Sequence, residues 1–145
     1  MNINDIKEMI QEDSKSIKDE VNIDTTSLSV PELSGKYHQL ISEEAMSLRL
    51  LRKEYDTLYR DRWVFYSGKA DPEVYENEPF DLKILKADID KFLNADELLN
   101  KQKDKVTLQE VKINLLTEFT KSIMSISFNI GNAIKWKKFL SGELG

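Results

Sequence analysis

A long series of apolar residues at helical spacing most limits what this chain can fold into. Between Tyr37 and Phe65, apolar side chains recur in steps of three, four and seven, and no proline interrupts the series before Gly68. This spacing places the side chains on one face of an α-helix and is typical of a seam that packs against another helix. The predicted seam consists of Tyr37, Ile41, Leu48, Leu51, Tyr55, Leu58 and Phe65.

The residues before the seam predict where this helix begins. Ser29-Val30-Pro31-Glu32 has the pattern of a capping box, so a helix is expected over residues 29–68, after an extended connection at Thr25–Leu28. Residues 1–24 form an acidic N-terminal arm with the spacing of a short amphipathic helix. The apolar residues of that arm are Ile3, Ile6, Ile10 and Ile17.

The middle of the chain breaks the helical pattern. Residues 69–93 contain Pro72, Pro79 and many acidic side chains, and they are predicted to form an acidic loop followed by short elements. The acidic loop at residues 71–81 is expected to be solvated; the alternatives are a mimic of DNA charge or a partner contact. Within them, Leu82–Lys86 fits either a short strand or the start of a helix. The spacing of Ile89, Phe92 and Leu93 fits a helical turn or two.

A second group of helices is expected over residues 94–142. Asn94-Ala95-Asp96-Glu97 offers a helix cap, and Asn129–Asn132 is expected to bend or break the helix before a basic, aromatic last helix that ends at Gly142. The lysines of that last helix fit phosphate binding and compensation of the helix dipole equally well. The expected apolar stripe is Leu98, Leu108, Val111, Leu115, Phe119, Ile123, Ile126 and Ile130.

The predicted fold class is therefore mainly α, with long amphipathic helices in one elongated domain spanning residues 1–145. Two long helices leave several apolar side chains near the C-terminus without cover, among them Phe128, Trp136, Phe139 and Leu140. Self-association is the expected remedy. The alternative is a monomeric bundle in which the N-terminal helix covers these faces.

Composition excludes several classes of function. The chain has 145 residues, a net charge of −5, no cysteine and one histidine, His38, which favours a protein without metal or cofactor. No glycine-rich phosphate loop or catalytic constellation is present, so an enzyme is not expected. No apolar run is long enough to span a bilayer and no leader precedes the chain, which predicts a soluble, intracellular protein without membrane contact.

The segment Tyr59–Gly68 combines arginines with aromatics. Guanidinium groups hold phosphates and aromatic faces stack on unpaired bases, so this mixture suits single-stranded nucleic acid. The alternative is that the aromatics belong to the core. At about 100° per residue, Arg49, Lys53 and Arg60 project within about 40° of one another, whereas Arg62 lies about 160° from Arg60, on the apolar seam. An arginine on the seam needs an acidic partner, or the helix end must open onto solvent or a ligand.

Three segments carry a family resemblance: residues 21–28 (VNIDTTSL), residues 60–68 (RDRWVFYSG) and residues 130–135 (IGNAIK). In these segments the chain resembles the UvsY recombination mediators of phages related to the T-even group, whereas residues 1–20 are hard to match. The resemblance implies a non-enzymatic factor in the cytoplasm of the infected host cell. Its implied partners are single-stranded DNA, the phage recombinase, which it helps to load, and the phage single-strand-binding protein that covers the DNA.

The resemblance also suggests the residues involved. The basic pair of the family falls on Arg60 and Arg62. Beyond the resemblance, we expect Lys53, Arg49 and Lys69 to add phosphate contacts and Trp63 or Tyr66 to stack on bases. Assembly into a ring-like homo-oligomer is implied for the C-terminal region, through Ile123, Ile126, Ile130, Ile134, Trp136 and Leu140. The alternative function is a structural or virion assembly scaffold of coiled helices, in which the arginine and aromatic segment is an interface and binds no DNA.

Overall fold

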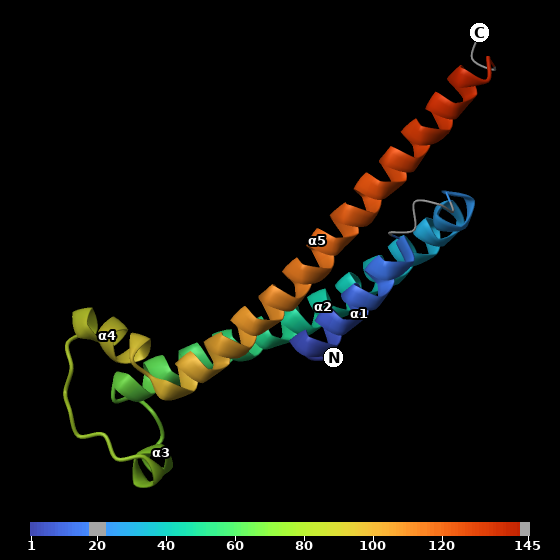
Figure 1. The fold of residues 1–145 in the computed structure, drawn as a ribbon. Coiled ribbons are helices and arrows are strands. Elements are labelled where there is room, and N and C mark those ends of the chain that lie inside the picture. Colours follow the sequence, from blue (N-terminus) through green and yellow to red (C-terminus); the bar gives the residue numbers. More distant parts are fainter. Residues whose placement is uncertain (18–22, 143–145) are drawn as a thin grey trace. The chain divides into compact units, whose positions relative to one another are not determined.

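The computed structural model describes residues 1–17 and 23–142 and consists of helices joined by connections (Figure 1). No strand is found among these residues, which confirms the mainly helical prediction. Two helices, α2 and α5, have 44 residues each. The elements are α1 (Ile3–Ile17), α2 (Ile23–Tyr66), α3 (Pro72–Asn77), the 3-10 turn η1 (Lys86–Asp88), α4 (Ile89–Asn94) and α5 (Glu97–Leu140).

Helix α2 begins earlier than the sequence predicts. It begins at Ile23 and continues through Pro31, so the extended connection at Thr25–Leu28 and the helix start at Ser29 are wrong. The low helix propensity of β-branched residues costs only a few tenths of a kcal/mol each, about 0.7 at most, which tertiary packing overrides. Val30 is buried in the core, and this packing offsets part of the cost of a proline inside the helix.

The end of α2 agrees with the prediction. Gly68 has φ +79°, its amide donates to the carbonyl of Phe65, and the amide of Lys69 donates to the carbonyl of Val64. This is the Schellman arrangement, in which glycine supplies the left-handed conformation that ends the helix. Tyr37, Leu48 and Phe65 of the predicted seam are buried, and its other members are partly buried.

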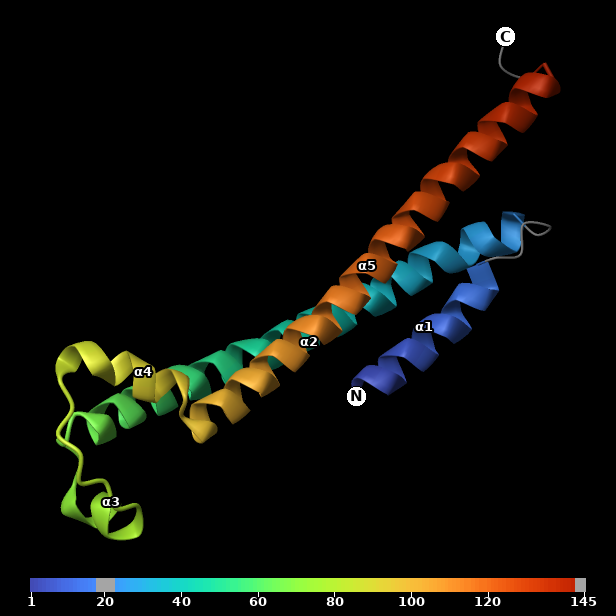
Figure 2. The same ribbon diagram turned by 60° about the vertical axis from the view of Figure 1, so that its left-hand side comes forward.

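The chain forms two compact units, and α2 and α5 contribute to both. The first unit comprises residues 1–45 and 111–145. Its core is built from α1, the beginning of α2 and the middle of α5, which Figures 1 and 2 show in blue, light blue and orange. The buried members are Ile6, Ile17, Val30, Tyr37, Leu116, Phe119 and Ile123.

Tyr37 connects all three helices of this first unit. Its ring lies 4.7 Å from that of Phe119 on α5, and its hydroxyl donates to Asp13 of α1 at 2.7 Å. Lys36 pairs with the same carboxylate at 2.8 Å. Burial and the bond to Asp13 raise the pKa of Tyr37. The predicted N-terminal amphipathic helix is thus confirmed, and its polar side is anchored to α2.

The second unit comprises residues 46–110. Ile89, Leu93 and Leu99 are buried there against Tyr55 and Leu58 of α2, so the predicted helical turn at residues 89–93 is confirmed. The predicted acidic loop contains the short helix α3. Leu82–Leu85 lies outside any helix or strand, with Leu82 and Leu85 exposed and Ile84 packed against the core of this unit.

The predicted apolar stripe of α5 is wrong in its first half. Leu98, Leu108 and Val111 are exposed, while Gln102 and Gln109 are buried. The amide of Gln102 donates to the carbonyl of Leu51 at 3.1 Å and to Glu54 at 3.2 Å, and these bonds make its burial favourable. A pattern that counts glutamine as polar therefore selects the wrong face.

The predicted break near Asn129–Asn132 is also wrong, because α5 continues without interruption to Leu140. A single glycine inside a helix costs only about 1 kcal/mol, and Gly131 is tolerated. Gly142, with φ +79°, follows the end of the helix as predicted. None of the described helices is both long enough and apolar enough to cross a membrane.

Candidate nucleic-acid interface

Helix α2 delivers the two arginines of the motif to opposite environments. The Arg60 side chain is 74% exposed, whereas that of Arg62 is only 9% exposed. Residues two positions apart on a helix are rotated by about 200°, which is about 160° in the other direction. One guanidinium therefore faces solvent when the other faces the core. The sequence predicts this division, and the structure confirms that Arg62 lies on the packed side.

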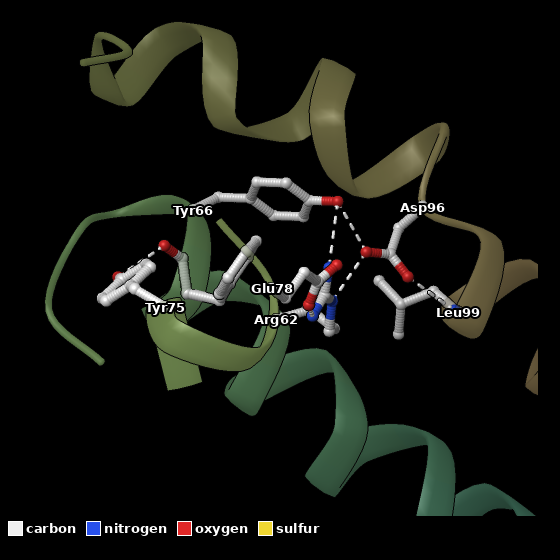
Figure 3. A network of polar contacts seen from close by, with 7 residues as sticks. Arg62, Tyr66, Tyr75, Glu78, Asp96 and Leu99 are labelled. Atoms are coloured by element: carbon white, nitrogen blue, oxygen red, sulfur yellow. Dashed lines mark hydrogen bonds and ion pairs between the residues drawn. The ribbon is translucent and has the colours of Figure 1, made fainter. Parts of the chain in front are cut away.

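Arg62 is surrounded by two carboxylates and a hydroxyl (Figure 3). Its Nε donates to Oδ2 of Asp96 at 2.7 Å, and Nη1 and Nη2 donate to the two oxygens of Glu78 at 2.7 and 3.0 Å. Nη2 also lies 3.3 Å from the hydroxyl of Tyr66. Burial alone would lower the pKa of Arg62, but these partners outweigh it and raise the pKa above its ordinary value. Of the two alternatives for a seam arginine, the structure shows the acidic partner.

Asp96 joins three parts of the second unit. Its Oδ1 accepts the amide of Leu99 at 2.9 Å and so caps α5, as the sequence predicts. Its Oδ2 accepts from Arg62 and, at 2.6 Å, from the hydroxyl of Tyr66. Burial alone would raise the pKa of Asp96, but the bonds from Tyr66, Leu99 and Arg62 outweigh it and hold the pKa below the ordinary 3.8.

This lowered pKa predicts acid sensitivity of the second unit. Because the folded-state pKa lies below the unfolded one, the stabilisation is fully present above about pH 4 and is lost as pH falls through the folded-state pKa. Asp96→Asn is expected to be less stable at neutral pH and to lose less stability on acidification, as measured by urea unfolding across a pH series. Asp90→Asn, at an exposed position of α4, is the control. An unchanged pH profile in Asp96→Asn would contradict the assignment.

The aromatic residues of the motif are divided in the same way. The ring of Tyr66 lies 5.2, 5.3 and 5.6 Å from those of Phe65, Phe80 and Phe92, and the Arg62 guanidinium lies 4.3 Å from the Phe65 ring. Tyr66 is thus engaged inside an aromatic cluster. Trp63, in contrast, is exposed and lies three residues after Arg60, on the same side of α2.

The exposed side of α2 carries a basic face formed by Arg49, Lys53, Arg60 and Trp63. All four side chains are exposed, and helical geometry keeps them within about 80° of one another. Asp56 interrupts this face, and Arg60 has only a long contact of 3.4 Å with Asp61. Among the described residues, Arg49 and Lys53 make no ion pair.

The remaining predicted site residues fall in different places. Lys69 is exposed just beyond the end of α2. Ile123 is 1% exposed, because it belongs to the core of the first unit, and Ile126 packs against that core. These two side chains are therefore already covered by the chain itself. The side chain of Ile130 lies outside the described residues, whereas Ile134, Trp136 and Leu140 are exposed.

Sequence reasoning missed two residues around Arg62. Glu78 follows helix α3 in a segment that the sequence predicts to be a solvated acidic loop, and Asp96 has a local signal only as part of a helix cap. The position of Arg62 on an apolar seam signals that a carboxylate is needed. Nothing in the sequence selects Glu78 and Asp96, which lie 16 and 34 positions away, from the other acidic residues.

Comparison with known proteins links this fold to DNA recombination. The structure resembles the crystal structure of the bacteriophage T4 recombination mediator protein UvsY, with a TM-score of 0.81 and 17% sequence identity over 97% of this chain and 98% of that one. No curated protein sequence matches the chain. The sequence profile of the UvsY family, described as recombination, repair and ssDNA-binding protein UvsY, matches residues 9–143. The chain therefore belongs to the UvsY family of recombination, repair and single-stranded-DNA-binding proteins, which is not a family of enzymes.

Proposed function

We propose that this protein binds single-stranded DNA through the basic face of α2 and helps to load a RecA-like recombinase onto strands covered by single-strand-binding protein. The observation that carries this proposal is the exposure of Arg60 and Trp63 on one side of α2. A guanidinium for phosphate and an indole for base stacking then lie one helical turn apart, which suits unpaired strands without sequence preference. Arg49, Lys53 and Lys69 extend the cationic surface.

Repetition of the basic face is the second part of the proposal. A chain with net charge −5 repels DNA as a whole, and one basic face with few cations holds phosphates weakly. A ring-like homo-oligomer places several copies of the face around one strand and multiplies the affinity. Support comes from the last turns of α5. In both views the ribbon of these turns extends past α1 and the beginning of α2 (Figures 1 and 2). They carry exposed apolar side chains, among them Trp136, Phe139 and Leu140.

The recombinase-loading role rests on the family and on the fold. The solved structure that this chain resembles is that of a recombination mediator protein. A mediator of this kind would act in the cytoplasm of the infected host cell, where its strand-binding assembly competes with the single-strand-binding protein and offers the recombinase an ordered strand.

Removing the exposed basic side chains tests the DNA-binding face. The triple variant Arg49→Ala/Lys53→Ala/Arg60→Ala is expected to weaken oligonucleotide binding at low salt by about tenfold or more. It should also flatten the salt dependence by about 0.7 in log–log slope for each phosphate that the variant no longer neutralises. Fluorescence anisotropy across a salt series measures both quantities. Circular dichroism should remain unchanged, because the three side chains are exposed.

Arg52→Ala is compared with the single variant Arg60→Ala, which removes the same side chain from the basic face. Arg52 lies on the same helix and carries the same charge, but its guanidinium pairs with Glu110 at 2.9 Å. It should retain nearly the affinity of the wild type. Equal reductions of affinity in Arg52→Ala and Arg60→Ala would place the DNA elsewhere, and a wild-type protein that ignores oligonucleotides would favour the scaffold function.

A further inference from the structure

We infer that Glu78 occupies the place of a DNA phosphate on Arg62, so that single-stranded DNA gains the second arginine of the motif only by displacing this carboxylate. The inference rests on the proposed function and adds a regulated phosphate contact on the other side of α2 from the basic face. Residues 71–81, which carry Glu78, are called the acidic strap below.

The two carboxylates around Arg62 differ in their exposure to solvent. Asp96 accepts from Nε of Arg62, and its side chain is buried, at 2% exposed. Glu78 accepts from Nη1 and Nη2, and its side chain is 51% exposed to solvent. Figure 3 shows the Asp96 carboxylate beside both the Arg62 guanidinium and the Tyr66 hydroxyl. Two parallel bonds from Nη1 and Nη2 to two oxygens are also how arginine binds a phosphate. Glu78 therefore takes the edge that a phosphate would use.

Charge balance shows why the carboxylate must leave. Arg62 with Asp96 is neutral, and Glu78 brings the group to a net charge of −1. A phosphate added beside Glu78 would place three anions around one cation, which is unfavourable in a partly desolvated site. A phosphate that replaces Glu78 leaves the net charge unchanged, and Asp96 keeps the guanidinium oriented throughout.

The acidic strap is anchored on both sides of Glu78. Before it, the hydroxyl of Tyr75 donates to the carbonyl of Phe65 at 2.8 Å and accepts the amide of Ala70 at 3.2 Å. After it, the ring of Phe80 lies 5.3 Å from the rings of both Phe65 and Tyr66. Because these anchors do not depend on Glu78, its exposed side chain can turn into solvent while the strap stays attached.

Neutralising Glu78 tests the inference in the full-length protein. Glu78→Gln keeps the size of the side chain but removes the charge that competes with phosphate. It is expected to bind a thymidine oligonucleotide about five- to tenfold more tightly than Glu76→Gln, with a salt slope steeper by about 0.7, the value for one further phosphate neutralised on a single strand. Glu76→Gln removes the same charge from the same strap at an exposed position that makes no ion pair with a described residue.

A residue-level measurement excludes a merely structural role for Glu78. Modification of arginines by phenylglyoxal, read by mass spectrometry, should be slow at Arg62 in the wild type and in Glu76→Gln, and faster in Glu78→Gln. Oligonucleotide should protect Arg62 again in Glu78→Gln. If Glu78 only supports the fold, its replacement lowers the melting temperature without tighter binding and without DNA-dependent protection of Arg62.

The outcomes separate this inference from the proposed function. If the wild type binds oligonucleotide but the two glutamine variants bind alike, the competition between Glu78 and phosphate is rejected and the basic face of α2 stands. If oligonucleotide leaves the modification rate of Arg62 in Glu78→Gln unchanged, the inference is rejected as well. If neither the wild type nor Glu78→Gln binds, both proposals fail together.

Discussion

Replacement of Arg62 by alanine is expected to lower the free energy of unfolding by about 3–5 kcal/mol, because it leaves the buried carboxylate of Asp96 without its cation. Asp96 is 4% exposed and retains only the bonds from Tyr66 and Leu99. The effect extends beyond one ion pair, since the same guanidinium holds Glu78 and lies against the Phe65 ring. Urea unfolding followed by circular dichroism measures the effect.

Arg60→Ala is the control for this prediction. It removes the same side chain two positions away, from a well-solvated environment, and should change stability by less than about 0.5 kcal/mol. The double variant Arg62→Ala/Asp96→Asn should recover part of the stability, because it no longer buries an unpaired charge. An Arg62→Ala protein as stable as Arg60→Ala would show that the buried cluster contributes nothing to the fold.

The contrast between the two arginines affects how DNA-binding variants are interpreted. A weaker affinity in Arg62→Ala reports damage to the second unit as well as any effect on phosphate binding. The salt dependence of binding separates the two causes. Loss of one phosphate contact lowers the log–log slope of affinity against salt, whereas partial unfolding can weaken binding without changing that slope. Arg60 is therefore the residue whose replacement reports on the proposed interface directly.

The double variant Trp136→Asp/Phe139→Asp is expected to break the proposed assembly and to lower affinity for long oligonucleotides by about a hundredfold or more. The two rings stack 5.6 Å apart on α5, and their residues are 60% and 58% exposed. Exposed aromatics of this size mark an interface, and two carboxylates there would oppose its burial. An assembly that presents several DNA-binding faces binds a long strand about 10²- to 10⁴-fold more tightly than one face alone. Dissociation of the assembly into subunits would remove this gain.

Leu108→Asp provides the matched control for the assembly. Leu108 is 51% exposed on the same helix, and its replacement makes the same kind of apolar-to-acidic change far along the sequence from Trp136. Sedimentation velocity should find the wild-type size for Leu108→Asp and smaller species for the double variant. A double variant that sediments like the wild type would place the interface elsewhere.

Point changes test the assembly more cleanly than a truncation at Ile123 would. The resemblance places self-assembly on residues from Ile123 onward, but Ile123 and Phe119 are buried in the core of the first unit. Removing the chain from Ile123 would therefore disturb folding and assembly together. Substitutions at Trp136 and Phe139 change only exposed side chains and leave that core intact.

Features that depend only on neighbours along the chain could be predicted from the sequence. Helical spacing fixed the seam of α2 and the opposite directions of Arg60 and Arg62, because rotation per residue is a property of the helix alone. Local chemistry fixed the cap at Asp96 and the helix end at Gly68, since both use bonds within a few residues.

Features that depend on distant partners could not be predicted from the sequence and are seen only in the folded chain. Helix α2 begins at Ile23 and not at Ser29, and Gln102 of α5 is buried where Leu98 is exposed. Glu78 and Asp96 are the carboxylates that pair with Arg62. In each case an interaction between residues far apart in the sequence stabilises the fold. Such interactions outweigh helix propensities, which differ by less than about 1 kcal/mol per residue among ordinary residues. The spacing of residues along one helix holds no information on which distant side chain meets it.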